Sequence, residues 1–165
     1  MITPMLIREA TAADWPGIWP FFREICAAGE TFTYPLHPAE EEARALWMVP
    51  APAHVVVAEE AGTILGTANM YANRAGNGAH VASASYMVDP ARQGRGTGRA
   101  LVTYSRDWAR AAGFRRIQYN AVVATNTPAL ALYRALGFEI LGTLPEGFRH
   151  PEHGYVGLHS LHRSL

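Results

Sequence analysis

The chain has 165 residues, 49% of them hydrophobic and 17% charged, which suits one domain over residues 1–165 and excludes a disordered or fibrous protein. Its 14 basic and 14 acidic residues give a formal net charge of zero, so no overall charge attracts nucleic acid or an anionic membrane, and we expect neither as a partner. A basic leader is lacking and no window approaches the ~18 apolar residues of a membrane helix, so the expected location is the cytoplasm.

The first elements expected are a strand over residues 5–9 and a helix that Asp14 can cap. Pro20 lies inside this helix and is expected to kink it or to delay its regular start. Cys26, the only cysteine, has apolar neighbours and is expected to be a buried thiol. One face of the helix carries apolar residues at intervals of three and four, namely Trp15, Ile18, Trp19, Phe22, Ile25 and Cys26.

Residues 29–35 have neither helical nor strand periodicity and are expected to form a loop. Its acidic and aromatic side chains, Glu30 and Tyr34 among them, could line an acceptor-binding site. A second helix follows, opened by Pro38 and carrying three glutamates in its first turn.

From His54 onward the pattern changes to strands. Residues 55–58 are expected to form a buried strand, and residues 64–71 its hairpin partner. A third strand follows over residues 80–88, and its small side chains would leave room beside the sheet; they are Ala82, Ser83, Ala84 and Ser85.

The third strand leads into the most distinctive segment, Tyr86–Arg99, in which glycines alternate with other residues before a helix begins. Such a loop keeps side-chain bulk away from its backbone amides, and the free N–H groups at a helix N-terminus attract anions. The segment therefore predicts a phosphate or pyrophosphate site. A Walker loop is excluded because Arg99 follows Gly98, and a dinucleotide fingerprint starting at Gly94 would need glycine at position 99.

The helix after this loop is expected to end at Gly113, and a strand over residues 117–124 comes next. Another helix starts at Thr127 and ends at Gly137, followed by strands over residues 138–144 and 155–162. In strand 117–124, Gln118 and Asn120 are expected on one face, and the other face is expected to carry Ile117, Tyr119, Ala121 and Val123.

Two motifs in this order resemble signatures of the GNAT family of acetyltransferases. The first is Gln93-x-x-Gly96-x-Gly98, which resembles the coenzyme A loop of the family. The second lies one strand later and reads Asn126-x-x-Ala129-x-x-Leu132-Tyr133-x-x-x-Gly137-Phe138. The order of elements is also similar to the whole GNAT fold. The resemblance implies an α/β (α+β) domain with a mixed, mostly antiparallel sheet, a splayed central strand pair and flanking helices.

The same resemblance implies acetyl-CoA as co-substrate. Its pantetheine arm would pair with the backbone of Met87 and Val88, and Asn126 would hydrogen-bond it. Backbone amides of the glycine loop would surround the pyrophosphate, with Arg92, Arg95 and Arg99 able to add positive charge. The cofactor-binding residues expected in this way are Met87, Val88, Gln93, Gly94, Arg95, Gly96, Thr97, Gly98, Arg99, Asn126 and Ala129.

Tyr133 matches the position of the family's general acid, and a backbone N–H near Val88 would stabilise the developing oxyanion. A phenol with a pKa of about 10 is a weaker acid than a thiol with a pKa of about 8.5, so full proton transfer is uphill by ~2 kcal/mol. Tyr133 therefore either hydrogen-bonds the thiolate as it forms or has its acidity changed by the site. The general base is left open between Glu30, His80 and a chain of waters.

A metal site is not expected. His150, His153, His159 and His162 are numerous enough for one, but His159 and His162 would point to opposite faces of strand 155–162.

The resemblance predicts an acetyl-CoA-dependent N-acetyltransferase whose acceptor is a small-molecule amine, an amino acid or an analogue of one. The C-terminal run looks like that of acetyltransferases acting on phosphinothricin, and Gln118 to Asn120 is similar to a strand of fungal enzymes that acetylate proline analogues such as azetidine-2-carboxylate. In those enzymes an asparagine on this strand helps to hold the substrate carboxylate, which implies that role for Asn120, with Ser83 opposite it. The substrate residues expected are thus Glu30, Tyr34, Ser83 and Asn120.

Other functions remain open at the level of sequence. The same family could acetylate a protein N-terminus or an antibiotic, and the chain could instead be a non-catalytic coenzyme A sensor. A homodimer through the last strands is also an expectation.

Overall fold

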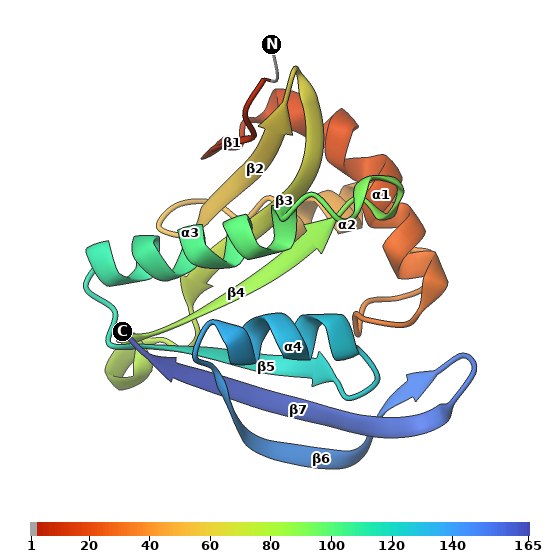
Figure 1. The fold of residues 1–165 in the computed structure, drawn as a ribbon, viewed down its shortest axis with the longest axis vertical. Coiled ribbons are helices and arrows are strands. Elements are labelled where there is room, and N and C mark those ends of the chain that lie inside the picture. The colour runs from red at the N-terminus through yellow and green to blue at the C-terminus, as the bar shows by residue number, and fades with distance from the viewer. Residues whose placement is uncertain (1–2) are drawn as a thin grey trace.

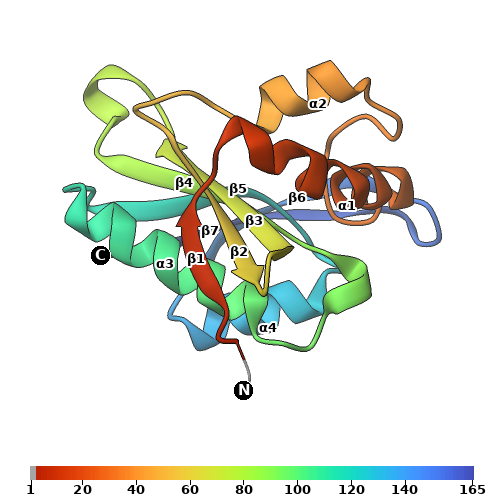
Figure 2. The same cartoon turned by 90° about the horizontal axis from the view of Figure 1, so that it is seen from above.

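The computed structural model describes residues 3–165, which form a seven-stranded sheet with helices on both faces (Figures 1 and 2). The strand order is β1-β2-β3-β4-β5-β7-β6, and β4–β5 is the one parallel pair in this sheet. The strands are Leu6–Glu9 (β1), His54–Glu60 (β2), Thr63–Ala72 (β3), Val81–Val88 (β4), Arg116–Val123 (β5), Glu139–His150 (β6) and Gly154–Ser164 (β7). The helices are Trp15–Ala28 (α1), Glu40–Trp47 (α2), Thr97–Ala111 (α3) and Thr127–Ala135 (α4). The predicted order of elements and the mixed, mostly antiparallel sheet are confirmed.

The hydrophobic core lies on both faces of the sheet, because successive strand residues point to opposite sides. Helices α1 and α2 cover one face, where Phe22 and Trp47 pack in one cluster with Val57 and Met87. Helix α3 covers the other face, where Leu101 packs with residues of β2 and β3 (Figure 2). The buried Cys26 belongs to the first cluster, as predicted.

Helix α1 begins differently from the prediction. Asp14 occupies the N-cap position, but its side chain makes no capping hydrogen bond to α1. Its carboxylate instead accepts the Thr11 backbone N–H at 2.7 Å and two N–H groups of Arg8 at 2.8 and 2.9 Å, so it joins β1 to the turn before the helix. The helix starts at Trp15 and includes Pro20, so its regular start is not delayed.

Strands β4 and β5 pair only at their beginnings, through Val81 with Arg116 and Ala82 with Ile117. Beyond Ala82 the two strands are not paired, which leaves an opening in the middle of the sheet (Figure 1). This is the splayed central pair that the family resemblance implied.

A β-bulge interrupts β5 between Tyr119 and Val122, where its pairing with β7 shifts register. The bulge shifts the alternation of faces, so Ala121 is exposed and Val122 is buried. The prediction that Ala121 lies on the same face as Tyr119 was wrong, because strict alternation holds only in a strand without a bulge.

Strands β6 and β7 are longer than predicted, and only a short turn separates them. His150 closes this turn, since its Nδ1 accepts the backbone N–H groups of Glu152 and His153 at 3.1 and 3.2 Å. On β7, His159 Nδ1 lies 2.6 Å from the Thr143 hydroxyl. Across residues 3–165, no three His, Cys, Asp or Glu side chains gather in a way that could hold a metal ion. None of the described helices has the length and apolar character needed to cross a membrane.

Candidate active site

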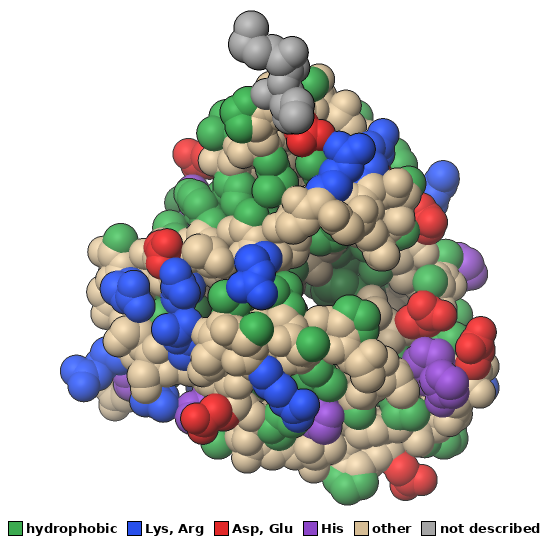
Figure 3. Space-filling model, in the orientation of Figure 1, with side chains coloured by type: hydrophobic (Ala, Val, Ile, Leu, Met, Phe, Trp, Pro, Cys, Tyr) green, Lys and Arg blue, Asp and Glu red, His purple; other side chains and the backbone are tan. Residues whose placement is uncertain are grey.

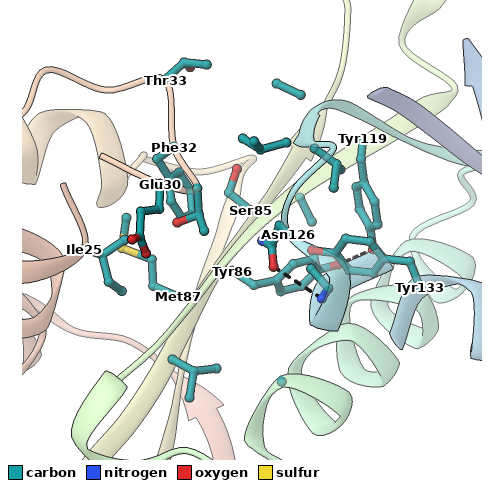
Figure 4. A pocket seen from close by; sticks show the side chains of 18 of the residues that line it. Ile25, Glu30, Phe32, Thr33, Ser85, Tyr86, Met87, Tyr119, Asn126 and Tyr133 are labelled. Atoms are coloured by element: carbon teal, nitrogen blue, oxygen red, sulfur yellow. Dashed lines mark hydrogen bonds between the residues drawn. The ribbon is translucent and has the colours of Figure 1, made fainter. Parts of the chain in front are cut away.

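The opening between β4 and β5 contains a cavity of about 690 Å³, visible as a hollow in the surface (Figure 3). Residues of α1, the loop after it, β3, β4, β5 and α4 line this cavity. Figure 4 shows Glu30 and Phe32 on one side of β4, and Tyr119, Asn126 and Tyr133 on the other. The strand therefore divides the site into two halves. We call the side with Glu30 and Phe32 the acceptor half, and the side with Asn126 the cofactor half.

The edge of β4 that faces the opening carries free backbone groups. Asp89 N donates to Leu65 O and Asn73 N to Val81 O, which sets the hydrogen-bonded pairs between β3 and β4. Such pairs alternate in an antiparallel ladder, so the backbone groups of Met87 point to β3 while those of Tyr86 and Val88 point to the opening. An extended ligand can pair with this edge, and the Val88 N–H is a donor directed into the cavity.

The glycine loop is shaped as an anion site. Gly94 and Gly96 adopt left-handed conformations with φ of +80° and +75°, and a Cβ built at either would meet nothing within 4 Å. The loop ends at the N-terminus of α3, whose first N–H groups have no acceptor within the helix. Thr97 starts that helix with a buried hydroxyl that has no hydrogen-bond partner within residues 3–165. These features fit a pyrophosphate held by backbone amides.

The three arginines near this loop lie in different surroundings. Arg92 forms an ion pair with Asp89, and Arg95 Nη1 lies 2.5 Å from Glu60 Oε2. Arg99 is exposed in the first turn of α3. Two of the three expected phosphate-binding side chains are thus paired with carboxylates of their own chain.

On the other side of the cofactor half, Asn126 caps α4. Its Oδ1 accepts the backbone N–H of Ala129 at 3.4 Å, so its Nδ2 is the group left to donate to a ligand. Asn126 and Ala129 both line the cavity, together with Gln93 and Gly98 of the glycine loop.

A chain of hydroxyl groups runs through the floor of this half. Ser105 Oγ donates to Val102 O at 2.8 Å, so it accepts from the Tyr86 hydroxyl, 2.5 Å away. Tyr86 in turn accepts from the Tyr119 hydroxyl at 2.6 Å. The protons of Tyr86 and Tyr119 are therefore committed to hydrogen bonds inside the protein.

Tyr133 lines the cavity and takes no part in this chain. Its ring lies 4.8 Å from that of Tyr119, which in turn stacks on Phe138 at 4.5 Å. Burial, with a smaller contribution from Tyr86, raises the pKa of Tyr133 above the ordinary value of 10. Tyr133 thus stays protonated and is a weaker acid than an ordinary tyrosine, which favours a hydrogen bond to the thiolate as it forms over acidity increased by the site.

All four expected substrate residues, Glu30, Tyr34, Ser83 and Asn120, line the cavity. The amide of Asn120 is already engaged, because its Nδ2 donates to Asn73 Oδ1 at 2.7 Å and its Oδ1 accepts from Gln118 at 3.3 Å. Of the two side chains considered as general base, Glu30 lines the cavity and His80 does not.

Tyr71, Tyr86 and Tyr119 also line the cavity, and none of them was assigned a role from the sequence. Tyr71 is brought beside Ser83 by the β3–β4 register. The signal for Tyr86 was alternation along β4, which places it on the face opposite Ser83 and Ser85.

Comparisons with known proteins agree with this geometry. Residues 19–138 match the family model described as the acetyltransferase (GNAT) family. A GCN5-related N-acetyltransferase structure from Kribbella flavida is 57% identical, with a TM-score of 0.95 over 98% of both chains. A Sinorhizobium meliloti phosphinothricin acetyltransferase, solved in complex with AcCoA, is 28% identical, with a TM-score of 0.82 over 98% of this chain and 88% of that one.

Among curated proteins, the L-methionine sulfoximine/L-methionine sulfone acetyltransferase of Pseudomonas aeruginosa is 30% identical over 146 residues, which are 85% of this chain and 83% of that protein. Several other curated relatives are matched over only 32% to 54% of their own length.

Proposed function

Because this chain belongs to the acetyltransferase (GNAT) family, we propose that it transfers the acetyl group of acetyl-CoA to the amine of a small molecule, an amino acid or an analogue of one. The observation that carries this proposal is the cavity in the β4–β5 opening. Its cofactor half adjoins the free edge of β4 and the glycine loop. Its acceptor half has room for an acceptor. The names of the Sinorhizobium and Pseudomonas relatives support the co-substrate and the class of acceptor.

Acetyl-CoA would supply a thioester carbonyl that an amine can attack. The N–H groups of the glycine loop and of the first turn of α3 would bind its pyrophosphate, while Asn126 Nδ2 and the edge of β4 would hold the pantetheine arm. The Val88 N–H would stabilise the negative charge that develops on the carbonyl oxygen.

Two proton transfers complete the reaction. The acceptor amine must lose a proton, and Glu30 or a water beside it would take this proton in the acceptor half. The leaving thiolate must gain one, and among the three clustered tyrosines only Tyr133 has a hydroxyl outside the internal chain. We therefore assign Tyr133 as the general acid.

The test is release of free thiol from acetyl-CoA across a panel of amines that contains amino acids, antibiotics and short peptides. The proposal predicts release with small amines and an acetylated amine as product. Release only with peptides or antibiotics would favour the other acceptors of this family. Binding of acetyl-CoA without any release would indicate a coenzyme A sensor and would refute the proposal.

Two further expectations belong to the same proposal. A homodimer through β6 and β7 is supported by the exposed large apolar side chains of Leu141, Leu144 and Tyr155 on these strands. A cytoplasmic location is the second expectation that we propose.

A further inference from the structure

The charge of the cavity suggests what kind of acceptor it takes. Within the described part of the chain, the charged side chains that line the cavity are Glu24 and Glu30, and both are acidic. An amino acid carries a carboxylate as well as an amine. Placing that carboxylate beside two others, without a cation to pair with it, would be unfavourable because like charges repel.

The neutral groups of the acceptor half do not replace the missing cation. Asn120, the residue expected to hold a substrate carboxylate, already shares its amide with Asn73 and Gln118. Ser83 is only 2% exposed, and its side chain lines the cavity. One such hydroxyl suits a neutral amide, ester or hydroxyl group on a ligand, because it can both donate and accept.

Aromatic rings form the outer side of the acceptor half. Phe32 stacks on Tyr34 with ring centres 5.3 Å apart, and Tyr34 stacks on the buried Phe22 at 5.7 Å. These contacts hold the two rings against the core, so they offer a fixed apolar surface. Such a surface suits an apolar body, and its ring faces also attract a cation.

Building on the proposed acetyl transfer, we propose that the acceptor is a small primary amine with an apolar body whose carboxyl group is absent or masked as an amide or ester. Glu30 attracts its ammonium group into the acceptor half. The ammonium first loses one proton to Glu30 or to water. Its neutral nitrogen then forms the C–N bond as the C–S bond of the thioester breaks, and the nitrogen loses its second proton as the amide forms. The thiolate takes the proton of Tyr133, and this second proton, passed through water, restores Tyr133.

The experiment compares matched acceptors by thiol release at saturating acetyl-CoA. One set is phenylalanine, phenylalaninamide and 2-phenylethylamine, and the other is leucine, leucinamide and 3-methylbutylamine. Masking the carboxylate as an amide also makes the ammonium group more acidic, and this alone would favour attack of the amine on the thioester. The decarboxylated amines lack this advantage, so they separate the two effects. We expect kcat/KM for both masked and decarboxylated acceptors to exceed that of the amino acid by about tenfold or more, which equals ~1.4 kcal/mol.

Glu30→Gln tests the cause of this preference, and Glu139→Gln, an exposed residue of β6 outside the cavity, is its control. Loss of the Glu30 charge should bring kcat/KM for the decarboxylated amine closer to kcat/KM for the amino acid. Glu139→Gln should leave the ratio of these two values unchanged. A role of Glu30 as base alone would lower kcat for all acceptors and leave the ratio as it was.

Equal or faster acetylation of the free amino acids would overturn this inference and leave the proposed acetyl transfer standing. Peptides that outperform the amides would also overturn it, because the acceptor would then not be a small molecule. If no amine of the two sets or of the wider panel released thiol, both the proposed acetyl transfer and the inferred acceptor class would be contradicted.

Discussion

At the scale of single residues, the assignment of Tyr133 depends on two observations. The hydroxyl protons of Tyr86 and Tyr119 are committed to the chain that ends at Val102 O, and that of Tyr133 is not. We expect Tyr133→Phe to lower kcat on the order of 100-fold, the usual range for loss of a general acid, with KM for acetyl-CoA unchanged. Steady-state kinetics would check this, and an unchanged kcat would remove Tyr133 as the acid.

The pH dependence follows from the same residue. Burial raises the pKa of Tyr133, so its acid form persists above the pH at which an ordinary tyrosine ionises. We therefore expect kcat to rise with pH as the acceptor amine loses its proton, without a fall before pH ~10. A fall centred below pH 9 that disappears in Tyr133→Phe would contradict the raised pKa.

Residue chemistry was the part of the site most accessible from sequence. Glycines spaced for a phosphate loop and an asparagine–tyrosine motif can be identified without coordinates, because each imposes its own local geometry. The contact of Asn120 with Asn73 could not be predicted, since Asn73 reaches it from a loop that the sequence does not place. The side chain of Asp14 was misassigned because an N-cap position does not reveal that Arg8 competes for the carboxylate.

At the scale of elements, the contact between β3 and α3 keeps the anion site in place. A Cβ at Gly66 would lie 2.8 Å from Met87 O and 3.0 Å from Thr97 Cγ2. Gly66→Ala should therefore destabilise the protein by ~1–3 kcal/mol and raise KM for acetyl-CoA, because the first turn of α3 must shift.

Gly142→Ala is the control for this prediction. Gly142 also lies in a strand, but a Cβ there would meet nothing within 4 Å. Its effect on thermal stability should stay within ~0.5 kcal/mol. Equal effects of the two variants would mean that the close approach of α3 to β3 is not what excludes a side chain at Gly66.

The ion cluster that ties β1 to the turn before α1 gives a second prediction at this scale. Hydrogen bonding to Arg8 lowers the pKa of Asp14 below its usual value of 3.8. A pKa that is lower in the folded than in the unfolded protein stabilises the fold at pH values above the unfolded-state pKa. This stabilisation is lost as the pH falls toward and through the folded-state pKa. Asp14→Asn should cost roughly 1 kcal/mol at pH 7, a modest figure because Arg8 is partly exposed, and progressively less below pH 3.8.

Urea unfolding at neutral and acid pH would measure this difference. Asp107→Asn is the matched control, because Asp107 makes its ion pairs on the surface with 57% of its side chain exposed. We expect it to change stability little at either pH. A cost of Asp14→Asn that stays constant down to pH 3 would contradict the assigned pKa shift.

Elements and their order were predictable because their patterns are local: apolar stripes for the helices, and buried runs for the strands. The bulge in β5 was not, since it depends on pairing with β7. The separation of β4 from β5 was implied by resemblance to a family and not by any residue pattern. The point at which the two strands separate, after Ala82, became known only from the register of the β4–β5 pairing.

At the scale of the whole molecule, the exposed apolar residues of β6 and β7 bear on its assembly. Burial of Leu141, Leu144 and Tyr155 against a second copy would remove apolar surface from water. Light scattering should then give a mass of two chains, and Leu144→Glu should shift it toward one chain with the fold retained. A wild-type mass of one chain at micromolar concentration would refute the homodimer.

The central claim is that acetyl transfer takes place where β4 and β5 separate, and a crystal structure with acetyl-CoA tests it most directly. We predict the pyrophosphate at Gln93–Arg99, the pantetheine arm along β4, the carbonyl oxygen within hydrogen-bonding distance of Val88 N and the sulfur beside the Tyr133 hydroxyl. Acetyl-CoA bound outside the β4–β5 opening, or with its sulfur away from Tyr133, would contradict the account.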